Sequence, residues 1–152
     1  ATLALSELAA QFAVDRLCTV LQTRGGLAVR RVDCFIDSFR DYLEARDEAF
    51  PVRPGDRIHG LLADWLAEQG PNSRWQGALG FNDDGLQVRW LRLHVVSDLP
   101  KAMPASDVKR WLSKWDAFID EENAREVVSP MQIGAMFHTS PLWVRAEAER
   151  RL

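Results

Sequence analysis

The sequence lacks several features that would place it at once in a functional class. No stretch approaches the ~20 apolar residues that a membrane-spanning helix needs, and no signal-peptide pattern opens the chain. The net charge is only -3 at pH 7, and acidic residues are interleaved with the basic ones. Arg24, Arg30 and Arg31 form the only loose basic cluster, which is typical of a solvated edge. We therefore expect no nucleic-acid partner and no membrane-spanning segment within this sequence.

The motifs of catalysis and metal binding are also missing. His59, His94 and His138 lie far apart, and no His-x-x-x-His or Cys-x-x-Cys spacing would place two ligands on one metal ion. No Gly-x-Ser-x-Gly elbow exposes a nucleophile. The segment 77–80 (GALG) lacks the third glycine, the lysine and the following helix of a phosphate-binding loop. We predict no catalytic residue, no cofactor-binding residue and no metal ligand, and hence a protein that is not an enzyme.

Cysteine is scarce, and its state is open. Cys18 and Cys34 are the only two cysteines. Both fall on apolar faces of predicted helices, where free thiols are commonly buried. One disulfide between neighbouring helices is the alternative, and it would place the domain outside the cytosol. The residues alone favour neither state.

What is present indicates one folded domain. The chain has 152 residues, about the length of one domain, and hydrophobic and charged residues make up 47% and 27% of it, a balance typical of a folded protein. Six Trp and seven Phe predict a core with large aromatic anchors. No repeat or long linker interrupts residues 1–152, which we take as a single domain. Because Ala1 stands in place of a starting Met, we expect a processed form or an excised fragment of a larger protein.

Apolar periodicity predicts amphipathic helices along most of the chain. The first three run over about residues 6–22, 32–44 and 56–69. A fourth follows Pro104, capped by Ser106 or by the residues just before it, and the last opens at Ser140 and runs to the end. Residues 126–139 suit an edge strand or a loop. Trp111 and Trp115 lie one turn apart in the fourth helix, which is typical of core packing against a sheet.

A β-hairpin stands between these helices. Two apolar runs, at about residues 75–81 and 86–96, flank the turn sequence Asn82-Asp83-Asp84-Gly85. In the second run the apolar phase slips by one residue after Trp90, and such a slip sends side chains to the opposite face. A bulge near Trp90-Leu91 would restore the register; otherwise the strand is covered on both faces. We predict an α+β fold in which this hairpin centres a small antiparallel sheet, backed by the helices, with the fourth helix covering one face.

One passage of the sequence resembles a known family. Residues 33–43 (DCFIDSFRDYL), followed by Phe50-Pro51-Val52, resemble the V-x-C-F-x-x-x-F-x-x-Y-L … F-P-V passage of the ectodomains of Patched- and Dispatched-like proteins, members of the resistance–nodulation–division superfamily of membrane transporters. The same template extends over nearly the whole chain, through residues 9–18, 61–66, 86–93 and 137–143.

The resemblance implies a fold, a location and partners. The domain would be an extracellular or lumenal loop, with a ferredoxin-like porter subdomain as its form, and its first partner would be the rest of its own membrane protein. The family handles sterols, lipids and lipid-modified proteins, and its coupling residues lie in membrane helices, so none is carried over here. The resemblance also favours a Cys18–Cys34 disulfide, worth ~3 kcal/mol through its constraint on the unfolded chain.

Two other functions remain open beside this interpretation. The chain would also suit a free-standing soluble interaction domain, binding a partner protein through the hairpin edge or its Trp faces. A small enzyme whose site is assembled only in space is the third hypothesis, and a histidine beside a carboxylate or thiol in a pocket would support it.

Overall fold

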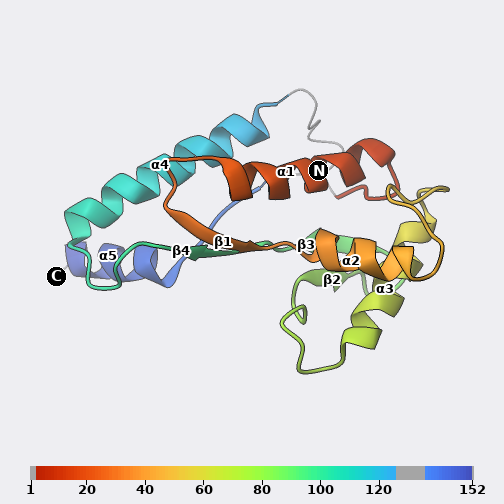
Figure 1. Cartoon of the computed structure of the whole chain (residues 1–152). Helices are drawn as coiled ribbons and strands as arrows, with labels where there is room; N and C mark the ends of the chain where they lie inside the picture. Colours follow the sequence, from red (N-terminus) through yellow and green to blue (C-terminus); the bar gives the residue numbers. More distant parts are fainter. Residues whose placement is uncertain (1–2, 126–135, 152) are drawn as a thin grey trace.

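The computed structural model describes residues 3–125 and 136–151. It contains five helices and four short strands (Figure 1). In chain order these are α1 (Leu8–Thr23), β1 (Val29–Asp33), α2 (Phe35–Glu44), α3 (Arg57–Gln69), β2 (Leu79–Phe81), β3 (Val88–Leu91), β4 (His94–Ser97), α4 (Ala105–Asn123) and α5 (Pro141–Arg151). The predicted α+β class is confirmed.

The strands form two separate antiparallel pairs. β2 pairs with β3, and β1 pairs with β4, so the described residues hold two sheets of two strands. The prediction of one sheet centred on the hairpin was wrong in this respect, and the pairs do not join into the single sheet of a ferredoxin-like subdomain within the described residues. The run 86–96 divides because its second half, β4, leaves the hairpin to pair with β1.

β1 was missed in the sequence. Val32 has helical spacing to Phe35 and Ile36, so residues 32–34 were assigned to the second helix. Val32 instead lies opposite Val95 in β4, and α2 begins only at Phe35. Isolated apolar periodicity cannot distinguish these alternatives, because the partner strand lies more than sixty residues along the chain.

The hairpin turn has the predicted chemistry. The side chain of Asn82 accepts hydrogen bonds from the N–H groups of Leu86 and Gln87, at 3.1 and 3.0 Å. Gly85 adopts a positive φ of 72°, which favours glycine. The first strand is shorter than expected, because residues 75–78 form turns before β2 begins.

A bulge accounts for the slip in apolar phase. Trp90 lies opposite Gly80 and Val88 lies opposite Phe81, so Arg89 is an extra residue in β3. Beyond it the exposed positions are Trp90, Arg92 and His94, while the alternate positions Leu91, Leu93 and Val95 are half-buried. The bulge predicted near Trp90 is confirmed, and the strand is not covered on both faces, because Trp90 is 48% exposed.

Two apolar cores lie along α1. The first core joins the first half of α1 to α2, α3 and the hairpin, and contains Leu5, Val14, Phe35, Ile36, Phe39, Leu43, Val52, Ile58, Leu62, Trp65, Trp75, Leu79 and Val88. The second core joins the other half of α1 to β1, β4, α4 and α5, and contains Cys18, Leu21, Leu27, Val32, Cys34, Trp115 and Phe118. Leu93 packs against both, so the inner face of the 91–95 stretch continues from one core to the other.

α4 covers the β1–β4 pair and not the hairpin, contrary to prediction. Trp115 and Phe118 pack in the second core with Val32 of β1. Their rings meet edge to face, with centroids 5.9 Å apart. Trp111 is half-buried, and the ammonium of Lys114 lies 4.2 Å from its ring centroid. Figure 1 shows α4 beside α1, over the β1–β4 pair, while α2, α3 and the hairpin lie at the other end of the molecule.

Helix starts differ slightly from the predictions. α1 begins at Leu8, two residues after Ser6, and α4 begins at Ala105 directly after Pro104, which leaves Ser106 inside the helix. α3 follows Asp56 as predicted, although that side chain makes no capping hydrogen bond. Of the ambiguous segment 126–139, residues 136–139 have no regular structure and the remainder lies outside the described residues.

A buried amide ties the loop after α2 to α1. Gln11, only 1% exposed, accepts a hydrogen bond from the N–H of Val52 at 2.8 Å and donates to the carbonyl oxygens of Val52 and Leu5, at 3.3 and 3.0 Å. Both ends of the amide are therefore satisfied, as a buried polar group requires. The loop bearing Phe50-Pro51-Val52 is held against the first core through this side chain.

Candidate functional site

Cys18 and Cys34 form a disulfide. It joins the middle of α1 to the residue immediately before α2, with a Cα–Cα distance of 6.0 Å. Both cysteines are 4% exposed within the second core, so the bond is shielded from solvent. This resolves the open choice between free thiols and a disulfide, and it removes both thiols as nucleophiles.

His59 joins α3 to the hairpin. Its Nδ1 accepts a hydrogen bond from the N–H of Val88 at 3.1 Å, so the neutral ring carries its proton on Nε2. Burial lowers the pKa of His59, against a smaller opposing effect of Asp56. The residue fills a structural role at the edge of β3.

His138 has both ring nitrogens engaged. Nδ1 accepts from the indole N–H of Trp143 at 3.2 Å, and Nε2 therefore carries the proton and donates to Asp116 at 2.6 Å. The ring also packs against Trp115, with centroids 6.1 Å apart. His138 therefore has no ring nitrogen left to accept a proton from a nucleophile. Its bond to Asp116 connects the segment before α5 to α4.

His94 belongs to a cluster centred on Asp33. The two residues lie opposite each other in the β1–β4 pair, and His94 Nδ1 lies 3.1 Å from Asp33 Oδ2. Arg31 donates from Nε to the other oxygen, Oδ1, at 3.1 Å, and Arg74, from the loop before β2, approaches Oδ1 at 3.8 Å. Three basic side chains from three segments thus surround one carboxylate where β3 gives way to β4.

The carboxylate stays ionised at neutral pH. Burial acts to raise the pKa of Asp33, whose side chain is 14% exposed, but the hydrogen bond with His94 and the charges of Arg31 and Arg74 outweigh it. The resulting pKa lies below the ordinary value. Asp33 therefore acts as a fixed negative charge that orients its neighbours.

The hairpin carries the exposed ring of Trp90, four positions before His94 in the sequence. Trp90 lies across Gly80, where an added Cβ would come within 2.0 Å of Trp90 Cε2. Only glycine leaves room for the ring at that position. Two residues further along, the guanidinium of Arg92 lies beside Gly77, in the same loop that carries Arg74. Exposed Leu86 (70%) adds a second apolar group at the tip of the hairpin.

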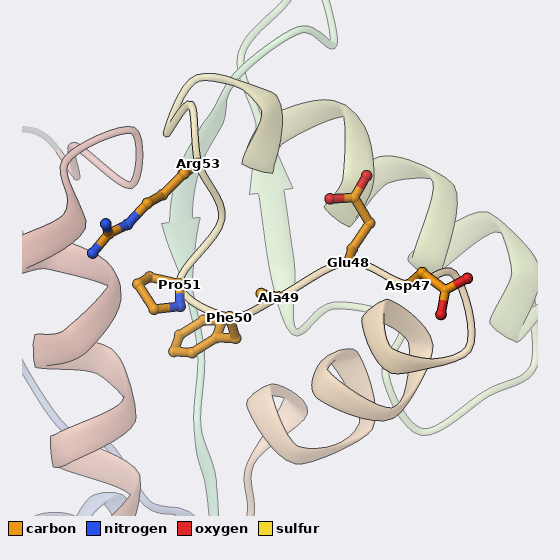
Figure 2. A pocket seen from close by; sticks show the side chains of 6 residues that line it. All are labelled: Asp47, Glu48, Ala49, Phe50, Pro51 and Arg53. Atoms are coloured by element: carbon orange, nitrogen blue, oxygen red, sulfur yellow. The ribbon is translucent and has the colours of Figure 1, made fainter.

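Two shallow hollows lie elsewhere on the surface. One follows the loop after α2 and is lined by Asp47, Glu48, Ala49, Phe50, Pro51 and Arg53 (Figure 2). The other lies between α3 and the hairpin, lined by Ala63, Leu66, Ala67, Gln76, Phe81 and Gly85. Neither contains a histidine, and the first mixes both charge signs in one open surface. Neither hollow therefore places a histidine beside a carboxylate, the arrangement that the small-enzyme hypothesis requires.

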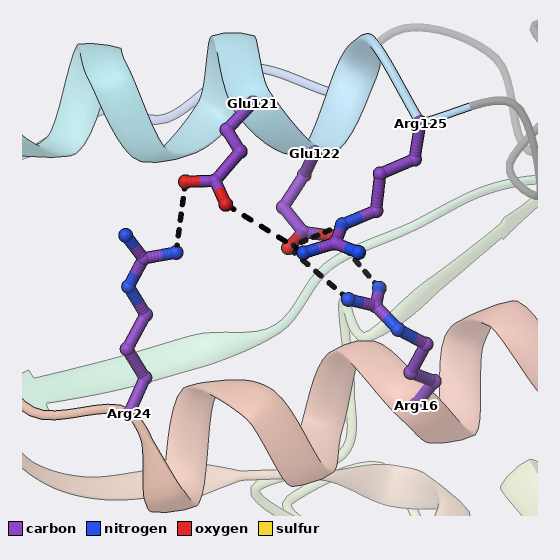
Figure 3. A network of polar contacts seen from close by, with 5 residues as sticks. All are labelled: Arg16, Arg24, Glu121, Glu122 and Arg125. Carbon is purple, nitrogen blue, oxygen red and sulfur yellow. Dashed lines mark hydrogen bonds and ion pairs between the residues drawn. The ribbon is translucent and has the colours of Figure 1, made fainter.

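Ion pairs connect α1 to α4 (Figure 3). The buried carboxylate of Glu122 accepts from Arg16 at 2.8 Å and from Arg125 at 3.2 Å. Arg24 pairs with Glu121 at 3.1 Å. Burial acts to raise the pKa of Glu122, but the bond to Arg16 and the two arginine charges bring it below the ordinary value. The three arginines of the loose basic cluster in the sequence have separate partners. Arg24 faces α4, Arg30 pairs with Asp98 and Arg31 pairs with Asp33.

No family model, curated protein or solved structure matches this chain. Within residues 3–125 and 136–151, no group of three or more potential ligands could hold a metal ion. In the same residues no helix is both long and apolar enough to cross a membrane. The surface around Asp33 and Trp90 combines guanidinium groups, an imidazole and an indole, which together suit binding of an anionic group.

No local pattern in the sequence predicts this surface. Asp33 was placed in a helix, and Arg74 lies 41 positions from it in the sequence. The one indication of this surface in the sequence is the irregular strand, in which Trp90, Arg92 and His94 alternate with apolar residues.

Proposed function

We propose that this chain is a non-catalytic extracellular or lumenal domain of a Patched/Dispatched-like membrane transporter that handles sterol, lipid or lipidated cargo. The observation that carries the proposal is the Cys18–Cys34 disulfide, which is the pairing that the resemblance implied. Disulfides persist in oxidising compartments outside the cytosol. The bond is buried between packed elements, as expected of a structural disulfide.

The residues of the resembling passage also have coherent structural roles. Phe35, Phe39 and Leu43 form the buried face of α2, and each is at most 1% exposed. Val52 is equally buried and is held by Gln11. The passage thus forms one side of the first core, which supports reading it as a unit of a shared fold.

The arrangement of histidines supports a non-catalytic role. His138 has no free ring nitrogen, and His59 accepts from the backbone. His94 is oriented by Asp33, but no hydroxyl or thiol hydrogen-bonds to its Nε2 within the described part of the chain. A His–carboxylate pair needs a nucleophile or a substrate pocket within reach to catalyse group transfer.

The full open reading frame, together with a topology measurement, tests the proposal. We expect apolar spans of ~20 residues on both sides of this sequence. A single cysteine introduced at exposed Ser113, in the full-length protein, should react with a membrane-impermeant maleimide in intact cells or sealed, lumen-out vesicles. A reading frame without such spans, or labelling only from the cytosolic side, would overturn the proposal.

A free-standing interaction domain is the second candidate. Leu86 and Trp90 expose 70% and 48% of their surface on the hairpin, which suits contact with a protein. A reading frame that ends without membrane spans, combined with a buried disulfide in the purified protein, would favour this candidate over the transporter domain.

A further inference from the structure

The region where β3 gives way to β4 has a strongly basic surface on an otherwise acidic protein. We define the junction surface as Arg31, Arg74, Trp90, Arg92 and His94. The side chains of Arg31, Arg74 and His94 are 61%, 67% and 71% exposed, and Trp90 and Arg92 are exposed as well. The chain as a whole carries a net charge of -3, so this concentration of three guanidinium groups is local.

Asp33 neutralises only part of this charge and positions the rest. Within residues 3–125 and 136–151 it is the only carboxylate that forms an ion pair with any member of the junction surface. Both of its oxygens are occupied, by His94 and by Arg31. Arg31 uses Nε for this bond, and its two Nη atoms donate no hydrogen bond within the described residues. These nitrogens are available for a bidentate bond to an incoming carboxylate.

Arg74 is also held in place by its surroundings. Its guanidinium lies 4.5 Å from the ring centroid of Trp75, a residue of the first core that is 7% exposed. A cation stacked on a buried indole loses less conformational freedom on binding than an unsupported arginine. Arg92 forms no ion pair in the described part of the chain, and its guanidinium lies beside the same 74–77 loop.

The exposed groups follow an extended backbone at every second position. Trp90, Arg92 and His94 alternate with Leu91, Leu93 and Val95, which pack inward. Side chains two residues apart on an extended chain are separated by ~7 Å. A second extended chain presents its own alternate side chains at the same interval.

We propose that the junction surface binds an extended acidic segment of a partner protein. Carboxylates on one face of that segment would meet Arg92, Arg74 and Arg31, while an apolar side chain on the same face, an even number of positions away, would cover the exposed face of Trp90. Trp90, Arg92 and His94 are exposed in one line along the chain, which favours a linear segment over an enclosed small molecule. The inference goes beyond the proposed transporter function and does not depend on it.

Binding of a defined probe by the 152-residue chain tests this inference. The probe is a fluorescent peptide whose alternate positions carry one Val and three Glu, with Ser at the positions between them, and the control probe has Gln in place of Glu. We expect saturable binding of the Glu peptide, weakened at least tenfold by R74E/R92E and severalfold by Trp90→Ala. The matched variant K109E/R110E makes the same change in net charge on the exposed face of α4 and should bind within twofold of the original chain.

Several outcomes would overturn the inference. These are equal binding of the Glu and Gln peptides, equal loss in R74E/R92E and K109E/R110E, or no measurable binding of the Glu peptide. Binding to vesicles of phosphatidylcholine and phosphatidylserine in place of the peptide would assign the surface to lipid headgroups and would overturn it too. If circular dichroism shows that R74E/R92E is unfolded, R74Q/R92Q replaces it with the same expected direction. Because no membrane is required for the peptide measurement, its failure leaves the topology test of the proposed function unaffected.

Discussion

The two cores at either end of α1 are built from different interactions. The first core is aromatic: Trp65 is fully buried, with ring centroids of Phe35, Phe39 and Trp75 about 6 Å away. The second core is smaller and depends on specific bonds, namely the disulfide, the Arg16–Glu122 pair and the His138–Trp143 hydrogen bond. The hairpin end therefore draws its stability from burial of apolar area, whereas the other end depends on crosslinks between elements.

The largest effect should come from removing the centre of the first core. Trp65→Ala deletes a side chain with no exposed surface and should cost about 3–5 kcal/mol of unfolding free energy. The measurement is urea unfolding followed by circular dichroism. Trp90→Ala is the matched control, because that ring is half-exposed, and it should cost below about 1 kcal/mol. Equal losses in the two variants would show that the first core does not depend on burial.

Reduction of the disulfide should cause the second-largest loss of stability, and this loss should fall on the second core. Cys18 and Cys34 are 16 positions apart, and opening a loop of that size costs ~3 kcal/mol. Hydrogen exchange after reduction should rise in β1, β4 and α4 before it rises in α3. The double variant C18S/C34S should be insensitive to reductant. Uniform acceleration of exchange across both cores would mean that they unfold as one unit and would remove the distinction between them.

The third prediction concerns the ion pair between α1 and α4. Glu122→Gln removes the charged partner of Arg16, leaves Arg125 with Glu121 alone at 3.6 Å, and should cost about 1–3 kcal/mol. Because the folded pKa of Glu122 is below its unfolded value, its contribution is complete above about pH 4.3 and is lost as the pH falls through the lower folded pKa. Unfolding free energy measured from pH 6 to pH 3 should therefore fall less steeply in the variant. An unchanged slope would contradict the assignment.

The smallest effect should arise at the exposed face of the hairpin. A Cβ at residue 80 would overlap the ring of Trp90, which is half-exposed and can move outward, so Gly80→Ala should cost about 1 kcal/mol. In a Trp90→Ala background the same change should cost less, and a double-mutant cycle measures the difference. Additive losses would show that the ring does not depend on glycine at this position.

Much of the fold could be predicted from local pattern. The amphipathic stripe of α2, the turn chemistry of Asn82 and Gly85, and the bulge behind the phase slip were all readable, because each depends on residues a few positions apart. β1 could not be identified in this way. Val29–Asp33 is a strand because β4 pairs with it, and no local signal specifies a partner so distant in sequence.

The candidate site could not be predicted from the sequence for the same reason. Arg31, Arg74 and His94 are unremarkable surface residues in the sequence, and they become a cluster only when β4 leaves the hairpin and turns to β1. The two cysteines were similar: their apolar surroundings were predictable, but their state depends on how α1 lies against the start of α2.

By itself the sequence determined the α+β class, the helical faces and the hairpin turn, because propensity, periodicity and turn geometry act over a few residues. Only the tertiary structure decided that the strands form two pairs, that α4 covers the β1–β4 pair, that Cys18 bonds to Cys34, and that a basic surface gathers around Asp33. These outcomes depend on pairing and burial between distant segments. The free energy of such contacts depends on the whole packed arrangement and cannot be read from any one segment.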